Sequence, residues 1–142
     1  MQSTLRVLLT ILGISAILIC LSVFILGPEA TAAMSERGYD ALTGWRGPPS
    51  GPWPATMDSE LRFYAPFWGA YGIALLAVAR DLAQLSRWVL WLALLFFVGG
   101  LGRVISYLAI GAPHPFFQAL MVIELVTPPL LVALWLGGRR GA

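Results

Sequence analysis

Residues Trp88–Ile110 read WVLWLALLFFVGGLGRVISYLAI, an apolar run whose only charged residue is Arg103. As an α-helix with a rise of about 1.5 Å per residue, this run is long enough to cross the hydrocarbon core of a bilayer. Three further apolar runs of comparable length lie at residues 7–26, 63–79 and 116–136. The sequence therefore predicts an all-α protein, an integral membrane four-helix bundle.

The composition supports this class over a soluble domain. Of the 142 residues, 58% are hydrophobic and 11% are charged, whereas soluble domains carry roughly 25% charged residues. We predict a single transmembrane domain over residues 1–142, with helices near residues 7–26, 57–79, 88–110 and 116–136 and the lipid bilayer as partner. The nine basic residues are scattered and belong to no recognisable nucleic-acid-binding fold, so we expect no nucleic acid partner.

One long connection, the loop 28–56, joins the first two predicted spans. Residues 30–42 could form a short helix, but residues 44–54 read GWRGPPSGPWP, and four prolines exclude a regular helix there. We expect this Pro/Gly-rich loop to face outward and to cover one end of the bundle as a lid. The alternative is a mobile, solvated loop.

The distribution of arginines predicts the orientation in the membrane. Cytoplasmic loops of membrane proteins carry an excess of basic residues. One side of the predicted bundle carries Arg6, Arg80, Arg87, Arg139 and Arg140, and the other carries only Arg37 and Arg46. Both termini are therefore predicted to be cytoplasmic.

Two charges fall within predicted spans at matching depth. Arg103 precedes Ile110 by seven residues and Glu124 follows Phe116 by eight, which places them about 10 Å and about 12 Å from the same end of the bundle. The short turn between these spans predicts antiparallel neighbours, and hence an Arg103–Glu124 salt bridge. Each charge alone at mid-bilayer costs about 2.5–3.5 kcal/mol on insertion scales, and pairing reduces that cost.

Other polar residues are expected near this pair. Tyr107 shares the helical face of Arg103, and Gly99, one turn before Arg103, is expected to let another backbone approach. Arg62 is expected at the outer interface above the pair, with Glu60 and Tyr64 at the rim. The sequence thus predicts an outward-facing polar pocket lined by Arg62, Arg103, Tyr107 and Glu124.

Three interpretations of the pair stay open: a structural clamp, a ligand or substrate pocket, and an interface with another membrane subunit. A metal centre is not expected, because a zinc site needs three or four ligands and His114 is the only histidine. His114 is interpreted as a turn residue. No phosphate loop, dinucleotide fingerprint or nucleophile motif is present, so no cofactor is predicted.

Three motifs in order resemble a known family: residues 58–64 (DSELRFY) followed by 69–72 (GAYG), residues 99–103 (GGLGR) and residues 124–129 (ELVTPP). Together they resemble the small bacterial four-helix membrane proteins grouped as domain of unknown function 4345, and more loosely DoxX-like proteins, some with redox accessory roles. The resemblance implies a four-helix membrane fold in a bacterial inner membrane and no assigned activity. It suggests as motif residues Asp58, Glu60, Arg62, Arg103 and Glu124.

The favoured functional hypothesis is a binding or accessory protein. It would hold a lipid-like or small amphipathic ligand, or a partner subunit, at a site built from Arg103, Glu124, Arg62, Tyr107, Glu60 and Asp58. The alternative is a small membrane enzyme with Glu124 as acid/base and Arg103 stabilising an anion. A proton-coupled transporter ranks last, because residues 88–98 are wholly apolar and offer no polar route.

Overall fold

A computed structural model describes residues 2–139 and, within them, is all-helical. Four of its helices are long and apolar enough to cross a membrane, as the sequence predicts. The six helices are α1 (Gln2–Leu26), α2 (Pro28–Thr43), α3 (Ala55–Arg80), α4 (Leu82–Leu85), α5 (Trp88–Ile110) and α6 (Pro115–Arg139). Three of the long helices extend beyond their apolar runs, because polar flanking residues continue the helix outside the hydrophobic stretch.

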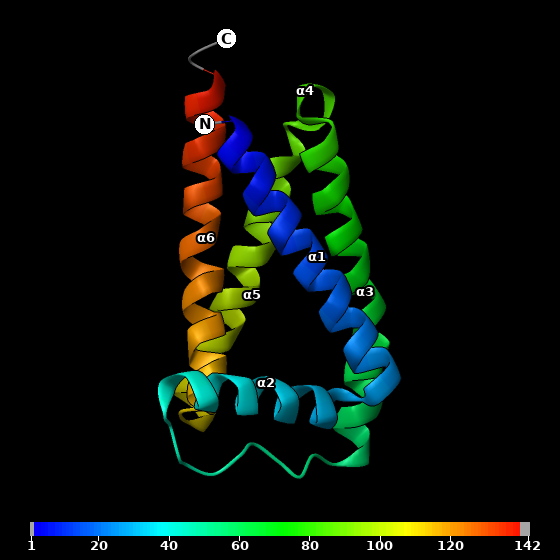
Figure 1. The fold of residues 1–142 in the computed structure, drawn as a ribbon, viewed down its shortest axis with the longest axis vertical. Coiled ribbons are helices and arrows are strands. Elements are labelled where there is room, and N and C mark those ends of the chain that lie inside the picture. The colour runs from blue at the N-terminus through cyan, green and yellow to red at the C-terminus, as the bar shows by residue number, and fades with distance from the viewer. Residues whose placement is uncertain (1, 140–142) are drawn as a thin grey trace.

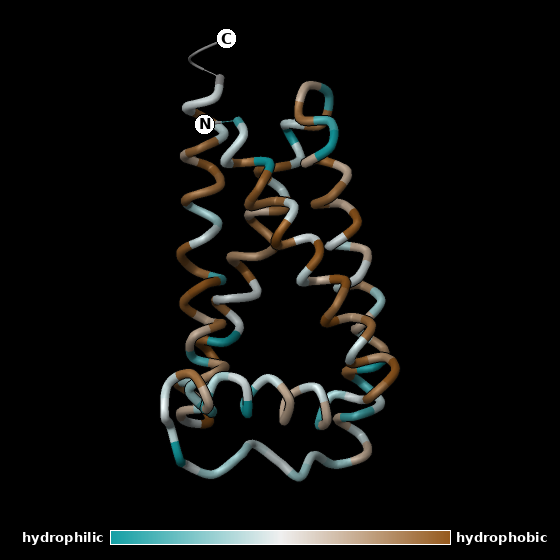
Figure 2. The backbone as a smooth tube through the Cα atoms, in the orientation of Figure 1, coloured by the Kyte–Doolittle hydropathy of each residue, from teal (hydrophilic) through white to brown (hydrophobic). Residues whose placement is uncertain are grey.

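The spanning helices form two antiparallel pairs, α1 with α3 and α5 with α6, which make the most extensive contacts in the structure. The pairs converge at the end that holds the chain termini and separate toward the opposite end, where α2 lies across them (Figure 1). The buried core, which includes Leu9, Leu75, Val89 and Leu131, joins α1, α3, α5 and α6. Figure 2 shows the apolar residues along the four long helices and more polar residues in α2 and in the connections.

Small residues allow the close contact between α1 and α3. A Cβ atom at Gly72 would lie 2.7 Å from the Gly13 carbonyl oxygen, and one at Gly69 would lie 2.8 Å from the Cys20 sulfur. Close approach at small residues is the usual basis of helix packing in lipid, where the hydrophobic effect does not drive helices together. The motif residues Gly69 and Gly72 therefore have a packing role.

Within the connection predicted at residues 28–56, the short helix considered over residues 30–42 is present and runs from Pro28 to Thr43. Pro28 begins α2 with a backbone angle suited to a helix start, and Gly44 ends it in the left-handed conformation with φ of 75°. The following coil, residues 44–54, returns along α2 to the start of α3 (Figure 1). The helix covers the end of the bundle where the pairs separate, and the Pro/Gly-rich coil lies on its outer side.

Two carboxylates hold this coil against α2. Glu36, almost fully buried, accepts hydrogen bonds from both the backbone N–H and the hydroxyl of Ser50. Glu29 accepts a hydrogen bond of 3.3 Å from the backbone N–H of Trp53. The coil is thus bonded to α2 at two points along its length.

The start of α1 and the end of α6 lie at the same end of the bundle (Figure 1), which is consistent with an even number of membrane spans. Which side of a membrane this end faces stays a prediction from the arginine count. Of the residues in that count, Arg140 and the side chain of Arg139 lie outside the part of the chain that the structure describes.

Candidate functional site

The predicted salt bridge between α5 and α6 is confirmed. Arg103 Nε lies 2.7 Å from Glu124 Oε2. The Glu124 side chain is 8% exposed and the Arg103 side chain is 38% exposed. The carboxylate is therefore buried, whereas part of the guanidinium lies at the protein surface.

Gly100 allows the two helices to approach at this level. A Cβ atom there would lie 3.0 Å from the Glu124 Cβ and 3.0 Å from the Leu125 Cδ2 atom. The expectation that Gly99 permits this approach is wrong, because a Cβ atom at Gly99 would meet nothing within 4 Å. Neighbouring helical residues differ by about 100° in direction, and it is Gly100 that faces α6.

Helical spacing places the pair on the inner faces of α5 and α6. Phe96, buried against Trp68 and Tyr71 of α3, precedes Arg103 by seven residues. Leu131, in the core, follows Glu124 by the same interval. Residues seven apart in a helix lie on nearly the same face. The pair therefore lies on the faces of α5 and α6 that carry Phe96 and Leu131, about two helical turns closer to the end where α2 lies.

Arg103 uses little of its hydrogen-bonding capacity within the protein. Its Nε donates to Glu124, and its guanidinium carbon lies 6.0 Å from the centre of the Phe117 ring. Among residues 2–139, its two terminal nitrogens form no hydrogen bond. A guanidinium has five N–H donors, and one of them is used in a hydrogen bond within the described residues.

Arg62 lies apart from this pair and belongs to a separate cluster. Its Nε lies 2.7 Å from Asp58 Oδ1, and its Nη1 donates a 2.7 Å hydrogen bond to the Phe24 carbonyl oxygen. Gly27, with φ of 96°, passes so close that a Cβ atom would lie 2.5 Å from Arg62 Nη2. Arg62 thus caps the C-terminal end of α1, where a cation is favoured.

The predicted four-residue pocket is therefore not formed as expected. The start of α3, which carries Asp58 and Arg62, lies at the opposite end of α2 from the end of α5 (Figure 1). Helix rise predicts depth along the bundle axis but gives no lateral position. The divergence of the helix pairs accordingly separates Arg62 from Arg103.

The remaining predicted site residues are exposed. Tyr107 is 37% exposed, and no hydrogen bond to its hydroxyl is formed by the described residues. Glu60 lies exposed on α3, and the exposed Tyr64 ring packs on Phe63 at 5.4 Å between centroids. Neither Glu60 nor Tyr64 contacts the Arg103–Glu124 pair in this arrangement, because both belong to the other helix pair.

The family model described as "Domain of unknown function (DUF4345)" matches residues 4–135. The chain belongs to this family. Comparison with curated proteins and with solved structures finds no match. For the DUF4345 chain, the recognised motifs thus divide between two clusters: Asp58 with Arg62 at the end of α1, and Arg103 with Glu124 between α5 and α6.

His114 has a role in the DUF4345 chain that sequence reasoning missed. Its side chain is 1% exposed and lies against α2 and the coil, with its ring 4.2 Å from the Trp45 ring and 6.3 Å from the Tyr39 ring. Its Nδ1 accepts a 3.2 Å hydrogen bond from the Phe116 N–H, and its Nε2 lies 3.4 Å from Asp40 Oδ1. No spacing in the sequence relates residue 114 to residues 39–45.

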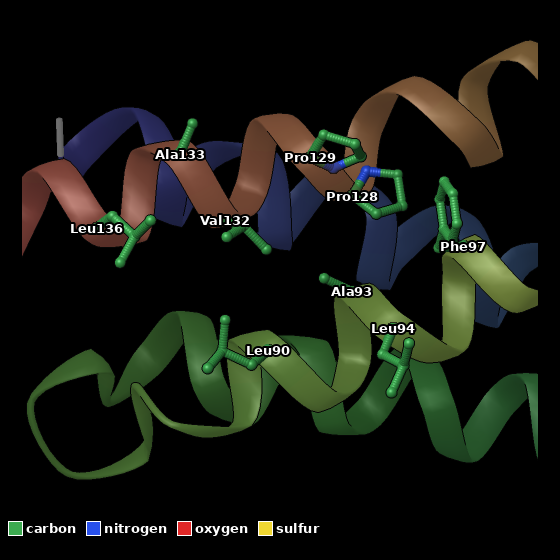
Figure 3. Close-up of a pocket in the computed structure, with 9 residues that line it drawn as sticks. All are labelled: Leu90, Ala93, Leu94, Phe97, Pro128, Pro129, Val132, Ala133 and Leu136. Carbon is green, nitrogen blue, oxygen red and sulfur yellow. The ribbon is translucent and has the colours of Figure 1, made fainter.

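Two hollows in the described part of the DUF4345 chain lie away from the salt bridge. The larger, about 500 Å³, is an apolar groove between α5 and α6 (Figure 3), with Phe97 and Pro128 at one end and Leu90 and Leu136 at the other. The smaller, about 180 Å³, lies near the chain termini. Within residues 2–139 no group of three or more His, Cys, Asp or Glu side chains is placed to hold a metal ion.

Proposed function

We propose that this DUF4345 protein is a multi-pass binding protein of the bacterial inner membrane, with both termini in the cytoplasm. In this proposal it holds an anionic, lipid-like amphiphile at Arg103, on the outward-facing side and beneath α2. One observation supports it above the others: the partly exposed Arg103 side chain donates to Glu124 through Nε alone, and its terminal nitrogens form no hydrogen bond with residues 2–139.

The chemistry of this arrangement favours an oxyanion. A guanidinium presents paired N–H donors in a planar fork that matches phosphate and carboxylate groups in a bidentate geometry. Glu124 fixes the guanidinium through Nε, so the edge formed by the terminal nitrogens is oriented before a ligand arrives. A headgroup phosphate or a free carboxylate would both satisfy these donors.

The surroundings favour an amphiphile over a water-soluble anion. Arg103 lies within an apolar helix, and Phe117 covers part of the guanidinium. An ionisable residue at this level is costly unless it is paired or functional. A ligand with an anionic head and a hydrocarbon chain places charge at Arg103 and apolar surface against the helices.

Lipid analysis tests the proposal directly. Wild-type protein, Arg103→Gln and the double variant Arg103→Leu/Glu124→Leu are purified in the same detergent, and bound lipids are extracted and quantified by mass spectrometry. Arg37→Gln serves as the charge-matched control, because Arg37 is exposed on α2 and bonds only within its own helix. We expect one class of anionic lipid to be enriched on the wild type and the control and lost from both Arg103 variants.

Two outcomes separate the alternatives. Equal lipid recovery from all four proteins would show that the pair is a structural clamp. Recovery of a carboxylic acid instead of a phospholipid would retain the site and identify the head group.

A further inference from the structure

Residues 28–54, α2 together with the coil 44–54, form a segment that we call the strap. The strap leaves α1 at Gly27 and returns to α3 at Ala55, so both of its attachments are to the same helix pair (Figure 1). Its far end, where α2 gives way to the coil, lies beside the start of α6 (Figure 1). The strap is thus anchored at one side of the bundle and reaches across to the other.

The anchored end is held by well-formed hydrogen bonds. Arg62 links the end of α1 to the start of α3 through its bonds to the Phe24 carbonyl and to Asp58. The Ser22 and Thr31 hydroxyls lie 2.8 Å apart and bond α1 to the first turn of α2. Because Glu36 and Glu29 bond the coil to α2, the strap can move as one body.

The far end is held differently. His114 is buried against the rings of Tyr39 and Trp45. Its Nε2 and the Asp40 Oδ1 atom are both buried, form no hydrogen bond with the described residues, and lie 3.4 Å from each other, within salt-bridge distance. Ring packing and this one polar contact therefore hold the far end of the strap.

The same contact leads to Arg103 through a row of rings. Tyr39 of the strap lies 6.2 Å from the Phe116 ring, and Phe116 lies 5.2 Å from Phe117. The Phe117 ring in turn lies 6.0 Å from the Arg103 guanidinium carbon. Movement of the far end of the strap would take Tyr39 away from Phe116, the first ring of this row.

We propose that the strap is a lid over the Arg103–Glu124 site, latched by His114 and hinged at Gly27. The hinge residue has φ of 96°, a conformation open to glycine. As a gate for ligand entry the lid rests on the proposed function, but its motion is measurable without any ligand.

The first measurement follows the motion itself. Nitroxide labels are placed at Leu42→Cys, 89% exposed at the far end of the strap, and at Ile123→Cys, 46% exposed on α6, in a Cys20→Ser background in nanodiscs. With the latch intact, electron–electron resonance should give one narrow distance distribution. His114→Ala, or Trp45→Ala as the second latch variant, should add a longer-distance population. Met34→Ala, an exposed change on the strap away from the latch, should not.

The second measurement follows access to the site. A reporter Glu124→Cys in the Cys20→Ser background is labelled with a water-soluble, charged thiol reagent. Each latch variant should raise the labelling rate about tenfold or more, because labelling of a buried thiol follows the population of the open state and truncation of a packed ring increases that population. Met34→Ala should leave the rate unchanged.

The outcomes are distinct. Unchanged distances in both latch variants would overturn the latch, and changed distances with an unchanged labelling rate would overturn the lid. If distances and labelling both respond but lipid recovery does not depend on Arg103, the lid stands as a moving element and the proposed ligand fails.

Discussion

Removal of Arg103 alone should be far more damaging than removal of the whole salt bridge. Arg103→Leu leaves the Glu124 carboxylate, 8% exposed, without the cation 2.7 Å away. Breaking a buried ion pair by removing one partner costs about 3–5 kcal/mol, because an uncompensated charge stays buried. Glu124→Leu should cost less, about 1–2 kcal/mol, since the Arg103 side chain is 38% exposed and can extend toward a polar boundary.

The double variant Arg103→Leu/Glu124→Leu should be close to wild type in stability. Replacement of a buried ion pair by apolar residues of similar volume is often neutral or stabilising. The two single costs add up to about 4–7 kcal/mol while the double variant costs close to nothing, so the expected coupling energy in this double-mutant cycle is about 4–7 kcal/mol. Reversible unfolding in mixed detergent micelles, followed by circular dichroism, measures all four free energies of unfolding. Additive single effects would refute the reasoning, since they would mean that the two side chains do not interact.

Three packing predictions follow from the same structure. Gly100→Ala should destabilise the protein by about 1–3 kcal/mol, because its Cβ would meet α6 at 3.0 Å. Gly99→Ala should leave the free energy of unfolding within about 0.5 kcal/mol of wild type, because its Cβ would meet nothing within 4 Å. The same unfolding assay compares the two variants. Gly72→Ala should lower the free energy of unfolding by about 2–3 kcal/mol, at least as much as Gly100→Ala. Its Cβ would lie 2.7 Å from a backbone oxygen of α1, which cannot move aside alone. A stability equal to wild type would contradict the packing of α1 on α3. Glu36→Ala should release the coil 44–54 and raise the rate of tryptic cleavage after Arg46 about tenfold. The lost hydrogen bonds to the buried carboxylate are worth about 1.5–3 kcal/mol, and local opening of the coil exposes the peptide bond after Arg46 to the protease. An unchanged digestion time course on gels would show that Glu36 does not hold the coil.

Much of the fold could be predicted because its signals are local. The four spans follow from runs of apolar residues, and their existence needs no knowledge of what they pack against. The Arg103–Glu124 pair could also be predicted, because a constant helical rise and a short turn between neighbouring helices place both side chains at one depth.

Other features depend on how the helices rotate and diverge. Gly100 and not Gly99 faces α6, since a one-residue step turns the helix by about 100°. Arg62 caps α1 and is separated from Arg103 because the two helix pairs separate toward α2. The burial of Glu36 against Ser50 and of His114 against Asp40 and Trp45 joins segments that no sequence periodicity relates.

By itself, the sequence determined the class of protein, the number of spans and the depth of the charged pair, because hydropathy and helical rise act along one chain direction. The tertiary structure alone decided which charges meet, which glycines are crowded and where α2 lies. Those features depend on lateral placement and rotation of helices, which result from packing among distant segments. The separation of Arg62 from Arg103 and the latch at His114 are the two consequences with most bearing on the proposed site.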